Sequence, residues 1–163
     1  MTHGRKPRQQ RWVARDPLAL AKNTATRLTP AEMSTMIDPL RAAATALREG
    51  VATEWEWAIV VSAVNVAQAI DKLGIVRGLS EHLLCGELAL RAIQQRAMAT
   101  GTWSATSLYY QEIDHLDTAV DLHEFQIHQL SYGEYHNALR QAEAEIRSTG
   151  GIVVDVGRER MAA

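Results

Sequence analysis

Cysteine is almost absent from this sequence, since Cys85 is the only one among 163 residues. A single cysteine excludes an internal disulfide framework and a CxxC zinc site. Aromatic residues make up only 6% of the chain, with one Phe, so the core must consist mainly of Ala, Leu, Ile and Val. No run approaches the roughly 18 apolar residues of a membrane-spanning helix. The N-terminus is basic and polar with no apolar stretch behind it, so we expect no signal peptide and a soluble cytoplasmic protein.

Recognisable catalytic signatures are also missing. The sequence contains no Gly-rich phosphate loop, no Gly-x-Ser-x-Gly elbow, and no kinase or deaminase motif. The string from His123 to His128 resembles HExxH but has one residue too many. Its two histidines therefore lie about 140° apart around a helix and cannot share one zinc ion. We expect no enzyme, no cofactor and no metal site.

Charge is divided unevenly along the chain. Residues 1–27 carry seven Lys and Arg against one acid, a net charge of +6, whereas residues 28–163 carry ten against eighteen, a net charge of −8. Because the first segment has two prolines and no sustained helical period, we expect it to be mostly disordered or draped over a surface. A solvated tail, an arm folded onto the acidic body and an arm that contacts nucleic-acid phosphates all remain open. The candidate nucleic-acid contacts in this arm are Arg5, Lys6, Arg8, Arg11 and Arg15.

The rest of the chain predicts an all-α fold, with a single bundle of about five helices over residues 28–149 and a short tail at 150–163. Capping boxes at Thr29, Thr53 and Ser131 mark three helix starts. Pro39 predicts a break with Asp38 as a new cap, or a kink. The stretch 152–156 looks like a strand but has no second strand to pair with. The expected helices span 30–49, 54–73, 80–100, 106–129 and 131–148.

The segment from Ala69 to Gly78 resembles the turn of a Fis-type helix-turn-helix. Leu73 would pack the first helix, Gly74 would take the left-handed turn and Ile75 would fill the angle between the helices. The following helix then offers Glu81, His82 and leucines where DNA contact requires donors for phosphates and base edges. The match predicts a DNA-binding turn that would use Arg77, and its plainer interpretation is a helix end followed by another helix.

The helix expected at 106–129 carries a narrow polar stripe at spacings of four, seven and eleven residues. The stripe could hold a hard metal ion or serve as an acidic docking surface for a basic partner, and its plainer interpretation is the solvated face of an amphipathic helix. Its members are Asp117, Asp121, Glu124 and His128. His123 falls instead on the apolar face of this helix, which predicts a core histidine bonded to a backbone group or a carboxylate. Tyr109 and Tyr110 are amphipathic rings of the kind that anchor interfaces or pack a bundle.

Two further strings carry a family resemblance. The loop Gly101–Thr106 and the string Leu122–Ile127, together with the basic N-terminal arm, resemble small all-α accessory proteins encoded on phages and integrative elements of proteobacteria. Some members of this group are labelled Fis-family regulators. The resemblance implies a mobile-element context and no established activity.

We therefore hypothesise a non-enzymatic interaction protein of a mobile genetic element, whose acidic helical body binds a partner protein. Inhibitors of host defence complexes, such as anti-CRISPR proteins, act in this way by covering nucleic-acid sites. The alternative is a DNA-binding transcriptional regulator that uses the basic arm and the helix-turn-helix. A protein partner is expected, nucleic acid through the arm and a homo-oligomer stay open, and no membrane contact is expected.

Overall fold

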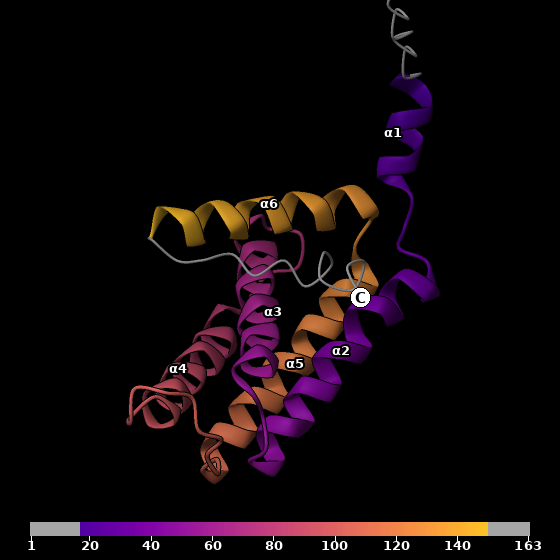
Figure 1. Ribbon diagram of the computed structural model, residues 1–163. Helices are drawn as coiled ribbons and strands as arrows, with labels where there is room; N and C mark the ends of the chain where they lie inside the picture. The colour runs from indigo at the N-terminus through magenta and orange to yellow at the C-terminus, as the bar shows by residue number, and fades with distance from the viewer. Residues whose placement is uncertain (1–16, 150–163) are drawn as a thin grey trace, which may run out of the picture.

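The computed structural model describes residues 17–149, and within that range the chain is entirely helical apart from turns and one isolated β-bridge. The all-α class is confirmed, but the described residues form six helices where five were predicted (Figure 1). None of these helices is both long enough and apolar enough to cross a membrane. The helices are α1 (Pro17–Ala25), α2 (Pro30–Glu49), α3 (Glu54–Lys72), α4 (Ser80–Ala97), α5 (Tyr110–Gln129) and α6 (Tyr132–Ser148).

Three of the helices begin where the capping boxes predict. Thr29, Thr53 and Ser131 each accept a hydrogen bond from the backbone N–H three residues later. The Glu at that later position accepts one in return from the N–H of the cap residue. Each reciprocal pair satisfies two backbone donors that a helix start leaves free.

The break predicted at Pro39 does not occur, because α2 continues through it. A proline inside a helix removes one backbone hydrogen bond and costs about 3 kcal/mol. The buried side chains of Ile37, Leu40, Ala43 and Leu47 hold α2 against the bundle on both sides of the proline. Their packing, together with the capping box and a left-handed Gly50 at the C-terminal end, offsets that cost.

The third helix is the centre of the molecule. It packs against α2, α4, α5 and α6, and Figure 1 shows α6 lying across one end of the bundle. The apolar sequence of α3 explains this position, since Val60, Ala69 and Ile70 are fully buried on different sides of the helix. One core cluster joins α2, α3, α4 and α5, and a second lies under α6.

The helix that was not expected is α1. Residues 1–27 are predicted to be mostly disordered or surface-draped, yet nine of them form this helix, which projects past α6 (Figure 1). Pro17 occupies its first position, where the missing N–H costs nothing. The segment after α1 is tied down as well, since the N–H of Tyr132 donates to the carbonyl of Thr26 at 2.9 Å.

Contact with α6 holds α1 in position, and a glycine on α6 allows the two helices to approach closely. A Cβ atom at Gly133 would lie 2.0 Å from Cγ2 of Thr24 and 2.9 Å from its carbonyl oxygen. Local periodicity gave no sign of this contact, because it joins positions more than 100 residues apart. The basic residues predicted to touch nucleic acid, numbered 5 to 15, and the strand-like stretch at 152–156 lie outside the described residues.

Candidate protein-binding surface

The predicted polar stripe lies on α5, beside α2. Asp117 forms an ion pair with Arg48, and Glu124 forms one with Arg41. The guanidinium of Arg41 also lies 3.4 Å from Oδ1 of Asp121. The stripe therefore links α5 to α2 through two arginines that were not part of the prediction.

These ion pairs are open to solvent. The side chains of Arg41 and Arg48 are about half exposed, and that of Asp121 is 69% exposed. Ion pairs of this kind contribute little stability, because water screens both charges and two long side chains must be held in place. Asp117, Asp121 and the two arginines thus stay available to a partner, whereas the Glu124 side chain is only 25% exposed and its Oε2 is buried. His128, at the far end of the stripe, has its Nε2 3.9 Å from Glu124.

The stripe extends beyond the four residues that were predicted to form it. Tyr110, Asp114 and Phe125 occupy the same arc of α5, since steps of four, eleven and fifteen residues return to nearly one side of a helix. Tyr110 is 84% exposed and Phe125 is 51% exposed. Asp114 is exposed and forms no hydrogen bond or ion pair within residues 17–149. The outer face of α5 is therefore a row of acids with an aromatic ring near each end.

The start of α5 is fixed by a charged cluster. Arg96 donates two hydrogen bonds of 2.6 Å to Glu112, and its guanidinium lies 4.6 Å from the ring centre of Tyr109. Burial alone would raise the pKa of Glu112, but the hydrogen bonds from Arg96 and from the N–H of Tyr109 outweigh it and lower the pKa. Glu112 also accepts from the Tyr109 N–H at 2.8 Å, so α5 begins at Tyr110 rather than near Thr106.

The loop before α5 is held by two tryptophans. Nε1 of Trp103 donates to the carbonyl of Ala52 at 2.9 Å, and its ring lies 5.8 Å from that of Trp57. The loop 102–109 therefore has a fixed attachment to the start of α3. This attachment presents Tyr109 and Tyr110 at the end of the bundle where α2 ends and α3 begins.

The histidine predicted for the core is buried on α5, as expected. Its environment differs from the prediction, because Nδ1 of His123 has no hydrogen-bond partner among the described residues. Burial lowers the pKa of His123 to about 4, and the neighbouring Gln126 side chain opposes part of this shift. Gln126 itself is fully buried and donates to the carbonyl of Ala67 on α3 at 3.1 Å. His123 is therefore a neutral side chain in the interior of the bundle, and it is not part of an exposed binding surface.

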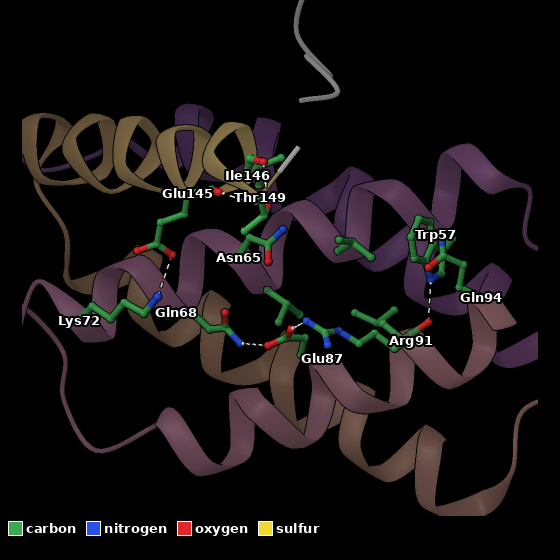
Figure 2. Close-up of a pocket in the computed structure, with 13 residues that line it drawn as sticks. Trp57, Asn65, Gln68, Lys72, Glu87, Arg91, Gln94, Glu145, Ile146 and Thr149 are labelled. Carbon is green, nitrogen blue, oxygen red and sulfur yellow. Dashed lines mark hydrogen bonds and ion pairs between the residues drawn. The ribbon is translucent and has the colours of Figure 1, made fainter. Parts of the chain in front are cut away.

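A groove of about 430 Å³ lies where α3, α4 and α6 meet (Figure 2). Its four charged side chains are all engaged with one another. Arg91 pairs with Glu87, and Nζ of Lys72 lies 2.7 Å from a carboxylate oxygen of Glu145. Gln68 donates to Glu87 at 2.8 Å. The groove thus presents balanced charge, with each acid paired to a base.

The segment that resembles a helix-turn-helix joins α3 to α4 by residues 73–79. This connection of seven residues is longer than the three or four of the DNA-binding motif. The N–H of Leu79 donates to Asp71 at 3.1 Å, and Nε of Arg77 donates to the carbonyl of Gly74 at 3.0 Å. Arg77 therefore folds against the turn, and a Cβ at Gly74 would lie within 2.9 Å of its guanidinium.

Metal ligands are not gathered anywhere in residues 17–149, where no group of three or more His, Cys, Asp or Glu side chains could hold an ion. One Glu-x-x-His string does occur on α5, from Glu112 to His115. Its carboxylate is already bound by Arg96 on both oxygens.

Some members of this surface had a sequence signal and others had none. Asp114 and Phe125 share the helical arc of the predicted stripe, so a wheel centred on Asp117 would have included them. The pairing with Arg41 and Arg48 depends on how α2 packs against α5, which no local pattern reveals. Comparison of this chain with models of known protein families, with curated proteins and with solved structures finds no match.

Proposed function

We propose that this chain is a non-enzymatic interaction protein that binds a partner protein through the outer face of α5. The observation that carries the proposal is the pair of exposed rings, Tyr110 and Phe125, at either end of the acidic stripe. The only Phe in the chain lies half exposed on this face while the core is built from smaller aliphatic residues. Large exposed aromatic side chains at the centre of an interface supply much of its binding energy.

The charge of this face defines the chemistry of the partner. Residues 28–149 carry sixteen acids and eight Lys and Arg, a net charge of −8. Asp114 is unpaired within the described residues, and Asp121 is mostly exposed. A basic surface with apolar pockets between its cations would complement this face and would be drawn to it at long range.

Basic grooves are the usual surfaces of proteins that handle nucleic acid. We therefore propose a partner of that class, which this chain would inhibit by occupying the groove in the cytoplasm. Together with the resemblance to accessory proteins of mobile elements, this supports an inhibitor of a host defence complex, such as an anti-CRISPR protein. No catalytic step is part of the proposal.

Affinity capture from the native host tests the surface. Wild-type bait should retain a partner that bait with Tyr110→Ala and Phe125→Ala loses, because the two rings supply the apolar anchors. The matched control is Val51→Ala, which removes an exposed apolar side chain from the turn between α2 and α3. Equal recovery by the wild type and the Tyr110/Phe125 variant would contradict the assignment.

A competition assay tests the partner class with the recovered complex. Single-stranded and double-stranded oligonucleotides should displace this chain from its partner, since both would occupy the same basic groove. The variant Asp114→Lys with Asp121→Lys should lower the association rate by at least about tenfold at low salt. Displacement that fails at every oligonucleotide length would reject the groove, even if the α5 surface stood.

The alternative is a DNA-binding regulator that uses the basic arm and the turn between α3 and α4. The seven-residue connection and the folded position of Arg77 do not favour it. It makes a separate prediction about sequence-specific DNA binding.

A further inference from the structure

The fourth helix has one face that no other described residue covers. α4 packs against α3 and α5, and Leu83 and Leu90 are buried on that side. Gly86 faces α5 so closely that a Cβ there would lie 2.8 Å from Cβ of Ala119. The opposite side of α4 carries Leu84 and Leu88, which are 51% and 54% exposed.

The side chains on this open face follow a coiled-coil spacing. Successive steps of three, four, three and four residues separate its members, which is the pattern of a and d positions in a heptad. We call this set the α4 seam, and each of its members is exposed. The α4 seam consists of Glu81, Leu84, Leu88, Arg91 and Gln95.

We propose that the α4 seam binds the α4 seam of a second copy of this chain, with the two helices antiparallel about a two-fold axis near Gly86. Leu84 and Leu88 lie two residues to either side of Gly86. Leu84 of each copy therefore meets Leu88 of the other copy. Glu81 and Arg91 lie five residues to either side, so the acid of each copy meets the base of the other. These are the a-to-d layers of an antiparallel coiled coil, and the contact is isologous.

Charge selects the antiparallel arrangement. A parallel pair in the same register would place Glu81 on Glu81 and Arg91 on Arg91, which is repulsive at both ends of the apolar centre. Glu81 forms no hydrogen bond or ion pair within the described part of the chain. The guanidinium of Arg91 pairs with Glu87 yet leaves its side chain 67% exposed, and its fork has donors for a second carboxylate.

The length of the seam sets the strength of the dimer. From residue 81 to residue 95 a helix rises about 21 Å, so each copy contributes only about four turns. A contact of this length with two apolar layers gives a dimer that depends on concentration rather than an obligate one.

The seam and the α5 surface lie on different sides of the molecule. Ala119, which meets Gly86 of α4, is about 180° around α5 from Tyr110. The outer face of α5 therefore points away from α4, and a dimer built on α4 would display two copies of it. This separation allows dimerisation and partner binding to be tested independently.

Sedimentation equilibrium of the full chain at about 5–500 μM tests the dimer. Glu81→Arg places Arg on Arg at both ends of the seam, and Arg91→Glu places Glu on Glu, so each variant should raise the dimer dissociation constant by at least about tenfold. An equimolar mixture of the two single variants should form a heterodimer, because every end pair is then complementary. The double variant should recover the wild-type homodimer.

The controls separate this proposal from a folding defect and from the proposed function. Circular dichroism should show the same helicity and melting temperature for all charge variants, since both positions are exposed. Phe125→Ala should leave the dimer intact while it removes the partner. A wild type that stays monomeric at 500 μM, or single variants that dimerise as the wild type does, would overturn the α4 seam, and so would a mixture that forms no heterodimer.

Discussion

His123 lies inside the bundle as a neutral imidazole, and this position makes the fold sensitive to acid. Burial lowers the pKa of His123 to about 4 in the folded chain, against 6.5 for an exposed histidine. Between these two values the unfolded chain binds a proton that the folded chain does not bind. The contribution of this group to stability is therefore fully present above pH 6.5 and is lost as the pH falls toward 4.

Urea unfolding at pH 7 and pH 5 measures this loss. The single titration of His123 should reduce the free energy of unfolding by about 2 kcal/mol between these two pH values. The variant His123→Leu should lack this part of the difference, whereas His82→Gln on the exposed start of α4 should retain it. An unchanged pH dependence in His123→Leu would show that another group controls the acid limb.

For single residues, the sequence predicted which side chains are buried or exposed better than it predicted their hydrogen-bond and ion-pair partners. The apolar arc of α5 placed His123 inside, and the polar arc placed Asp117 and Asp121 outside, because burial follows the helical period. Nδ1 of His123 has no hydrogen-bond partner among the described residues, and its ring neighbours the Gln126 side chain rather than the expected backbone group or carboxylate. The partners of the stripe, Arg41 and Arg48, come from α2. Both differences concern contacts between helices, which depend on tertiary packing.

The starts of helices were predicted correctly where a capping box marks them. The boxes at Thr29, Thr53 and Ser131 each combine a hydroxyl with a Glu three residues on, and all three mark true starts. At α5 Glu112 also accepts from the N–H of the cap residue, but that residue is Tyr109 rather than Ser or Thr, and the start was placed four residues early. α1 was missed, because a nine-residue helix is marginal by itself and forms here against α6.

The dependence of α1 on α6 can be tested at Gly133. In Gly133→Ala the new Cβ would lie 2.0 Å from Cγ2 of Thr24 and 2.9 Å from its carbonyl oxygen, so α1 must move away. Hydrogen exchange of the backbone amides of residues 18–25 should accelerate by at least about tenfold as their opening free energy falls. α6 should keep or gain stability, because Ala is favoured over Gly in a helix by about 1 kcal/mol.

The matched control for this experiment is Ser148→Ala, an exposed position at the far end of the same helix. It raises helix propensity without adding an atom next to Thr24, so α1 should exchange as in the wild type. Wild-type protection of α1 in Gly133→Ala would mean that the backbone absorbs the added methyl group without releasing the helix.

At the scale of the whole molecule, the near-neutral net charge of −2 conceals two opposite regions. The described bundle is acidic, and its two open faces use charge differently. The α5 surface has an excess of acid and suits a basic partner, whereas the α4 seam balances Glu81 against Arg91 and suits a copy of itself. A dimer formed through the α4 seam would present two α5 surfaces to one target. This arrangement raises the apparent affinity wherever the target has two sites within reach.

The same charge division predicts how the chain behaves toward DNA. Five Lys and Arg between residues 5 and 15 can contact phosphates, while a body of net charge −8 repels them. Binding to duplex DNA should therefore be independent of sequence and should weaken by about 500-fold between 50 and 200 mM salt, as expected for five released counterions. A gel-shift series with the full chain measures both properties.

Two variants decide between this outcome and the regulator alternative. Replacement of the five arm residues by Gln should abolish the gel shift. Arg77→Ala should leave the shift unchanged, because the Arg77 side chain donates to the carbonyl of Gly74 and folds against the turn. A complex that persists at 200 mM salt on one sequence and weakens in Arg77→Ala would establish the α3–α4 turn as a DNA-reading element. The face of α4 that carries Glu81, Leu84 and Leu88 argues for the first result, since phosphates require donors that these three side chains cannot supply.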